Sequence, residues 1–64
     1  MKLYNYFQKN VKIIDIDDKV WKGYVLTYTP KIDTEDELYD EIGLDCEEGL
    51  IGFRQNEIKS IEEI

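Results

Sequence analysis

The chain lacks histidine altogether and has one cysteine and one proline in 64 residues. Cys46 has no second cysteine for an internal disulfide, and without histidine it forms neither a zinc site nor a Cys-His nucleophile pair. Reduced cysteine chemistry of this kind fits a cytoplasmic protein. No glycine-rich phosphate-binding loop is present either. We therefore expect no cofactor, no metal site and no enzymatic activity.

Long hydrophobic runs are also missing. No segment approaches the roughly 18 consecutive apolar residues of a membrane span, and Met1–Tyr6 lacks the apolar core of a signal peptide. We expect no membrane contact. Residues 1–64 then form one domain, close to the smallest size at which a hydrophobic core alone stabilises a fold. Association with another chain, as a homo-oligomer or with a protein partner, is the expected additional source of stability.

Basic residues are scarce: 8 Lys and Arg oppose 15 Asp and Glu, for a net charge of -7. The segment from Asp33 to Glu48 holds more than half of the acids and no Lys or Arg. Nucleic-acid backbones repel such a surface, which disfavours RNA and favours a basic protein partner. The alternative is a solvated acidic face that keeps a small protein soluble.

What the chain does have is a regular succession of short β patterns. Gly23 inside the second of these predicts a sharp bend, and Pro30 predicts the end of that strand and a loop over residues 30–37. Leu3, Tyr6 and Phe7 recur at helical spacing and predict a short amino-terminal helix or turn. The five predicted strands are Val11–Ile16, Val20–Thr29, Glu41–Glu47, Leu50–Arg54 and Glu57–Ile61.

These patterns predict a mainly β fold, a small and strongly bent five-stranded antiparallel barrel formed as a meander. Alternation along the second strand predicts Trp21 and Val25 on one face and Tyr24, Leu26 and Tyr28 on the other. The predicted core consists of Ile13, Trp21, Val25, Ile42, Leu44, Phe53, Ile58 and Ile61.

Two motifs flank the acidic segment. Trp21–Val25 has an aromatic residue, a spacer, a glycine, a spacer and an aliphatic residue, and Phe53–Ile58 has an apolar residue, an arginine and a later aliphatic residue. They resemble the two-part signature of Sm-like (LSm) proteins, five-stranded barrels that often form rings and often bind RNA, and in particular small uncharacterised bacterial members. The resemblance covers about Val11 to Ile61. Another SH3-type barrel is the alternative, because such barrels share bent strands and glycine placement.

The resemblance implies an RNA-base pocket at Lys31, Asp33 and Arg54. The chain keeps the arginine of the family as Arg54 but departs from the family beside it: Lys31 offers no aromatic platform, Asp33 stands where the family has asparagine, and Gln55 replaces a glycine. An ionised Asp33 only accepts hydrogen bonds, whereas asparagine also donates. The reading without a ligand is that Arg54 pairs with Asp33 or another carboxylate at the rim of the barrel.

Tyrosines and acids supply the candidate protein-binding surface. Tyr24 and Tyr28 are candidates for a ring interface or for an aromatic groove that receives a cation. With the acids around the loop, the predicted partner-binding residues are Tyr24, Tyr28, Asp36, Glu37, Asp40 and Glu41.

The sequence therefore leaves three candidate functions. The first is a non-enzymatic interaction or scaffold module that self-associates through its edge strands, the fourth strand of one subunit joining the fifth of the next. The second is an RNA-binding Sm-like protein. The third is an acidic mimic of nucleic acid that blocks a basic cleft, supported by charge density alone.

Overall fold

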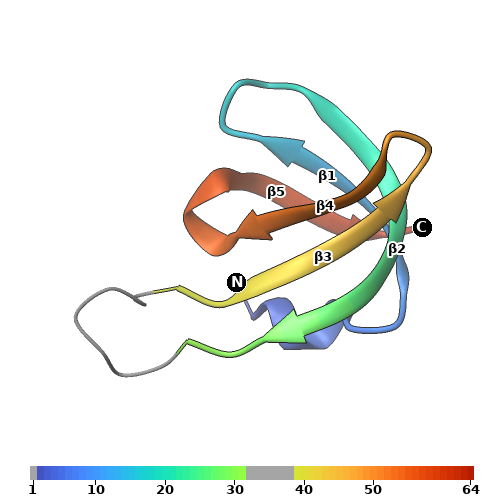
Figure 1. Ribbon diagram of the computed structural model, residues 1–64. Helices are drawn as coiled ribbons and strands as arrows, with labels where there is room; N and C mark the ends of the chain where they lie inside the picture. Colours follow the sequence, from blue (N-terminus) through green and yellow to red (C-terminus); the bar gives the residue numbers. More distant parts are fainter. Residues whose placement is uncertain (1, 32–38) are drawn as a thin grey trace.

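Five antiparallel strands in one sheet make up most of the computed structural model (Figure 1), which describes residues 2–31 and 39–64. Two short 3-10 helices accompany the strands, and each predicted strand overlaps an observed one. The mainly β class and the amino-terminal turn are thus confirmed. The elements are η1 (Leu3–Tyr6), β1 (Asn10–Asp15), β2 (Val20–Thr29), β3 (Glu41–Cys46), β4 (Gly49–Arg54), η2 (Gln55–Glu57) and β5 (Ile58–Glu63).

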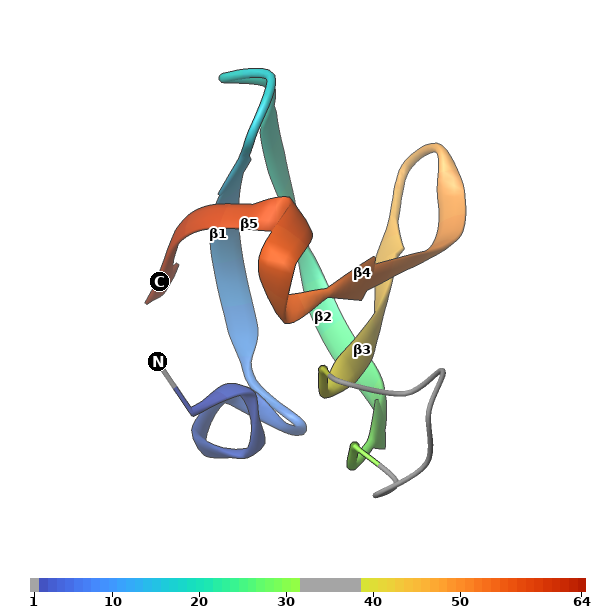
Figure 2. The same cartoon turned by 90° about the vertical axis from the view of Figure 1, so that its left-hand side faces the viewer.

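The sheet is bent but open, with strand order β4-β3-β2-β1-β5. The predicted closed barrel is therefore wrong: β4 and β5 are the two edges, and no ladder joins them within the described residues. η2 lies between β4 and β5, and β5 runs beside β1 (Figure 2), so the ladder from β4 to β5 that the predicted meander required is the one that is missing from the described residues. The pairing of β5 with β1 sets Ile61 opposite Ile13 and buries Ile58.

Gly23 marks the bend of β2, as predicted. It lies where β2 passes from its ladder with β1 to its ladder with β3, and Tyr24 belongs to both ladders. A Cβ atom at Gly23 would lie 2.4 Å from the backbone oxygen of Asp45, so only glycine allows this close approach. Both views show the resulting curvature of β2 (Figures 1 and 2).

A bulge in β2 overturns the predicted alternation after Val25. Val25 pairs with Leu44 and Tyr28 pairs with Ile42, while the register shifts between them. Leu26 is the extra residue, and it is exposed. One extra residue moves every later side chain to the other face of the sheet. Tyr28 consequently packs against the core, on the face predicted for Trp21 and not on the opposite one.

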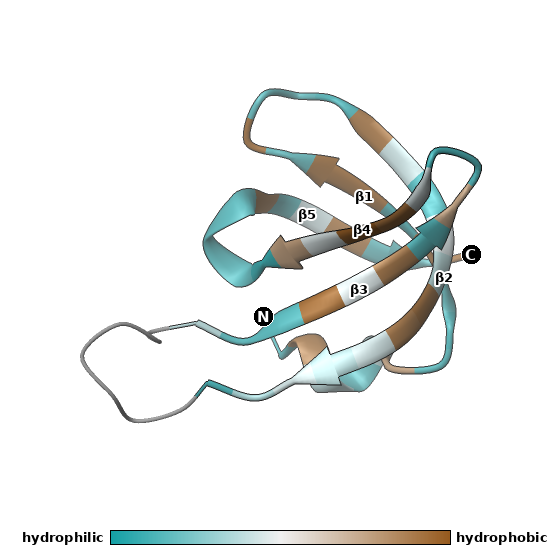
Figure 3. Cartoon of the chain, in the orientation of Figure 1, coloured by the Kyte–Doolittle hydropathy of each residue, from teal (hydrophilic) through white to brown (hydrophobic). Residues whose placement is uncertain are grey.

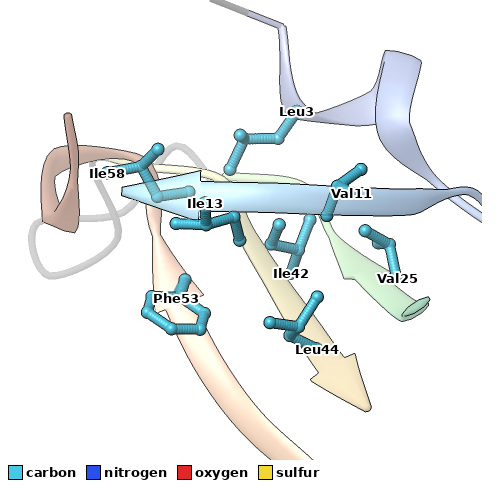
Figure 4. Packing of buried hydrophobic residues seen from close by; sticks show 8 residues of the cluster. All are labelled: Leu3, Val11, Ile13, Val25, Ile42, Leu44, Phe53 and Ile58. Atoms are coloured by element: carbon cyan, nitrogen blue, oxygen red, sulfur yellow. The ribbon is translucent and has the colours of Figure 1, made fainter. Parts of the chain in front are cut away.

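The core lies on the concave side of the sheet (Figure 4) and is entirely apolar among the described residues. Trp21 and Ile61, predicted as core, pack at its margin and are only half-buried. Leu3 and Val11 belong to the core although the sequence did not predict them there. Leu3 lies in η1 and is fully buried, so η1 covers one open end of the sheet. The buried residues are Leu3, Val11, Ile13, Val25, Ile42, Leu44, Phe53 and Ile58.

The polar residues gather at the turns. The strands hold most of the apolar side chains, whereas the turn between β3 and β4, Glu47 and Glu48, is hydrophilic (Figure 3). β2 ends at Thr29, directly before Pro30, as predicted. Most of the predicted loop that follows lies outside the described residues, which resume at Tyr39.

Candidate functional site

Asp40 ties together three segments at the end of β2. Its carboxylate accepts a hydrogen bond from the Tyr28 hydroxyl at Oδ2 and one from the Lys31 backbone N–H at Oδ1, each 2.8 Å long. Its backbone carbonyl accepts a third, 2.9 Å long, from the N–H of Gln55 in η2. One residue thereby fixes the exit of β2, the entry to β3 and the turn before β5.

The hydrogen bonds of Asp40 shift two titrations in opposite directions. The bond from the Lys31 N–H, followed by that from Tyr28, lowers the pKa of the Asp40 carboxyl, because both donors stabilise its ionised form. The hydrogen bond to the same carboxylate raises the pKa of Tyr28, because an ionised phenolate could not donate that bond. The negative charge of Asp40 would also repel the phenolate. At neutral pH the pair is a charged carboxylate bound to a neutral phenol.

Arg54 lies next to a carboxylate at the end of β4. It is the register partner of Glu41, and its Nε is 3.8 Å from Glu41 Oε1. Its backbone N–H donates to Glu57 Oε1 at 2.9 Å, which caps η2. Arg54 does pair with a carboxylate, which is Glu41, but the pair closes no barrel rim because the sheet is open. Both side chains are about half exposed, so the pair adds little stability.

The residues predicted for RNA binding meet carboxylates. Asp40 binds the backbone of Lys31, and Glu41 pairs with the guanidinium of Arg54. Asp33, the third member, lies outside the described residues. Two adjacent acids, Asp40 and Glu41, thus contact the two described members of this predicted site.

The residues predicted for partner binding separate into two places. Tyr28, Asp40 and Glu41 lie together at the end of β2, whereas Tyr24 is paired with Asn10 and Asp45 farther along the strand. The last two members, Asp36 and Glu37, lie outside the described residues.

Tyr28 belongs to an aromatic cluster that the sequence did not predict. The ring of Tyr4 meets that of Tyr28 edge to face, with centroids 5.4 Å apart. Phe7 lies 6.5 Å from each of them. We call Tyr4, Phe7 and Tyr28 the aromatic cluster. No spacing in the sequence could reveal it, because η1 and the end of β2 meet only in the folded chain.

A second aromatic site lies at the start of β2. Trp21 donates its indole N–H to Asp15 Oδ2 at 2.9 Å, and the Nζ of Lys19 stands 4.0 Å from the ring centroid. Asp15 Oδ1 also accepts the backbone N–H groups of Asp17 and Lys19, each at 2.9 Å. These bonds, with that from Trp21 the largest cause, lower the pKa of Asp15. Asp15 therefore organises the turn that follows β1.

The surface beside Trp21 is hollowed. A depression of about 340 Å³ is lined by Val20, Trp21, Lys22, Glu47 and Glu48. Its charged groups are of both signs, and the nearby indole already has the ammonium of Lys19 over it. The depression accordingly has no marked preference for a ligand of one charge.

Comparisons with protein-family models, with curated proteins and with solved structures found no match for this chain. Among residues 2–31 and 39–64, no helix has the length and apolar character needed to cross a membrane.

Proposed function

We propose that this chain is a non-enzymatic interaction module that self-associates, β4 of one subunit pairing with β5 of the next. The observation that carries the proposal is the strand order, which leaves β4 and β5 as the edges of one bent sheet. Edge strands present backbone donors and acceptors that another strand can satisfy. A second copy of the chain always brings the complementary edge, so head-to-tail pairing can close into a ring.

The β4 edge has few of the devices that normally prevent strand pairing. Soluble proteins protect edges with charges, prolines or bulges. β4 has none of these before Arg54, its last residue, and the ladder to β3 runs without a register shift. Leu50 on this strand is 59% exposed. An uncharged and regular edge favours addition of a strand.

The β5 edge is charged, but its charges are matched within the subunit. Lys59 pairs with Asp18, Glu62 with Lys12. Glu63 likewise pairs with Lys9. Each β5 charge thus already has an opposite neighbour, which reduces repulsion when an uncharged β4 approaches. The exposed Ile64 adds apolar surface at its end.

The proposed family is Sm-like, which rests on the resemblance together with its structural context. The Trp21–Val25 motif lies where β2 bends, and the Phe53–Ile58 motif spans the end of β4, η2 and the start of β5. A bent sheet with these motifs at its bend and at its last turn supports the assignment, with another SH3-type fold as the alternative.

Light scattering across a dilution series tests self-association directly. We expect a particle several times the 7.6 kDa subunit mass, and a monomer at all concentrations would overturn the proposal. The variant Leu50→Lys/Gly52→Lys should dissociate the particle, because it places two charges on β4. A side chain fits at Gly52, where a Cβ would meet nothing closer than the Glu41 carboxylate at 3.6 Å.

The matched control is Val20→Lys/Leu26→Lys, which adds the same charge at exposed positions of the central strand β2. It should leave the mass unchanged. If both double variants dissociate the particle alike, net charge and not the β4 edge governs association.

RNA binding and nucleic-acid mimicry are not the functions we propose. The carboxylates beside Lys31 and Arg54 oppose an RNA backbone, and no described contact favours a basic cleft over any other basic partner. The ratio of absorbance at 260 and 280 nm of the purified particle checks the first of these, since bound RNA would raise it.

A further inference from the structure

The aromatic cluster is rigidly built yet open to solvent. Leu3, fully buried beside it, anchors η1 to the core. Two backbone bonds fasten the segment after η1 to β2, from Gln8 N–H to the Val25 carbonyl and from Val25 N–H to the Lys9 carbonyl, each 2.9 Å long. Tyr4 is nevertheless 64% exposed. A large aromatic side chain held outward on a fixed backbone is preorganised for contact with another molecule.

The electrostatic character of the cluster is negative. The faces of aromatic rings attract cations, and the Asp40 carboxylate lies within hydrogen-bond distance of the Tyr28 hydroxyl. The net charge of -7 reinforces this preference. The chemistry that complements the cluster is a cation.

At Trp21, a cation from the same chain already lies over the aromatic ring. The Trp21 ring holds the ammonium of Lys19 at 4.0 Å. In the part of the chain that the structure describes, no cation lies over the rings of Tyr4, Phe7 or Tyr28. Among the described residues, the aromatic cluster is thus an exposed aromatic surface with no cation over its rings.

We propose that the aromatic cluster, with Asp40 beside it, binds a lysine or arginine side chain of a partner protein. The cation lies against the exposed ring of Tyr4, within the roughly 6 Å at which a ring attracts a cation. Asp40 supplies the negative charge next to Tyr28. No residue of the site belongs to β4 or β5, so it gives a self-associated particle several identical contacts for a basic partner.

An NMR titration of the ¹⁵N-labelled protein tests the proposal. The probe is a blocked pentapeptide with one arginine among glycines, and the reference is the same peptide with glutamine in place of arginine. We expect the arginine peptide to shift the amide signals of Tyr4, Phe7, Tyr28 and Asp40, with weak affinity and with loss at high salt. Equal effects of both peptides, or shifts elsewhere only, would overturn the proposal.

Substitution of Tyr4 provides the decisive comparison. Tyr4→Ala should weaken binding of the arginine peptide about fivefold, while Tyr4→Phe, which keeps the ring, should bind like the original. Tyr24→Ala, a tyrosine outside the cluster, is the matched control. Unchanged affinity in Tyr4→Ala would refute the site.

The same titration on Leu50→Lys/Gly52→Lys separates this inference from self-association. Arginine binding that persists in a dissociated subunit supports the cluster whatever the oligomer. Loss of binding in that variant, with Tyr4 intact, would place the cation at the subunit interface and overturn the single-subunit site.

Discussion

Two aspartates at the two ends of β2 each accept a hydrogen bond from an aromatic side chain, but they do so in different settings. Asp15 binds Trp21 and two amides of its own turn, and Lys19 covers the ring. Asp40 binds Tyr28, whose ring continues into a cluster with the exposed Tyr4. The first site is local and internally satisfied, which suits a role in stability. The second joins distant segments and stays open, which suits recognition.

β2 itself connects the two sites, and breaking its bend should have the largest effect. Gly23→Ala forces a Cβ to within 2.4 Å of the Asp45 backbone oxygen, so the two strands must separate. We expect a loss of about 2 kcal/mol or more in the free energy of unfolding, a large share of what a small domain has. Urea denaturation measures it.

Gly52→Ala is the control for this loss, because its Cβ meets only ordinary contacts at 3.6 Å and beyond. It should change the free energy of unfolding by less than about 0.5 kcal/mol. Equal losses in the two variants would show that glycine itself, and not the close approach at Gly23, matters.

The Asp15 site should dominate the response to acid. The folded state lowers the pKa of Asp15 below its ordinary value of 3.8, so its contribution is present above that value and is lost as the pH falls through the folded pKa. Asp15→Asn should be less stable at neutral pH and should lose less stability on acidification than the original protein. Thermal unfolding at a series of pH values tests this.

Asp40→Asn should also lower the stability at neutral pH and weaken its dependence on acid, but by less than Asp15→Asn. The reason is that the Asp40 carboxylate accepts two hydrogen bonds, whereas the Asp15 carboxylate accepts three. Asp17→Asn is the control, since its side chain makes none of these bonds. A shallower acid response in Asp40→Asn than in Asp15→Asn would reverse our ranking of the two sites.

The smallest effect should come from removing one hydroxyl. Tyr28→Phe deletes the donor to Asp40 and keeps the ring, at a cost of about 1 kcal/mol. The bond raises the pKa of Tyr28 above its ordinary value of 10.0, so its contribution is lost as the pH rises through the folded pKa.

Tyrosine absorbance under alkaline titration follows this directly. The variant should lose the tyrosine that ionises at the highest pH, and the pKa of Asp40 should rise. Tyr24→Phe should retain the ionisation at the highest pH. Loss of that ionisation in Tyr24→Phe would show that it belongs to Tyr24 and not to Tyr28.

Much of the fold could be predicted because its signals are local. Pro30 cannot donate to a ladder, and β2 ends just before it; Gly23 has no side chain, and β2 bends there. β-branched residues determine β1 in the same way. The pairing of Arg54 with a carboxylate was also anticipated, although its partner Glu41 was not.

What failed depended on contacts between distant segments. The bulge at Leu26 moves Tyr28 to the face of the sheet opposite to the one that simple alternation predicts. No residue in β2 indicates this bulge, because it arises from the register with β3. Closure into a barrel failed because β5, which follows η2, pairs with β1 and has no ladder to β4 within the described residues.

The sequence by itself determined which segments form strands, where β2 bends and ends, and a strongly acidic charge, because these follow from the shape and charge of single residues. Only the tertiary structure decided which strands remain as edges and which side chains meet. Tyr4 and Tyr28 come together because η1 packs Leu3 into the core. Such a contact depends on the whole chain burying its apolar surface at once.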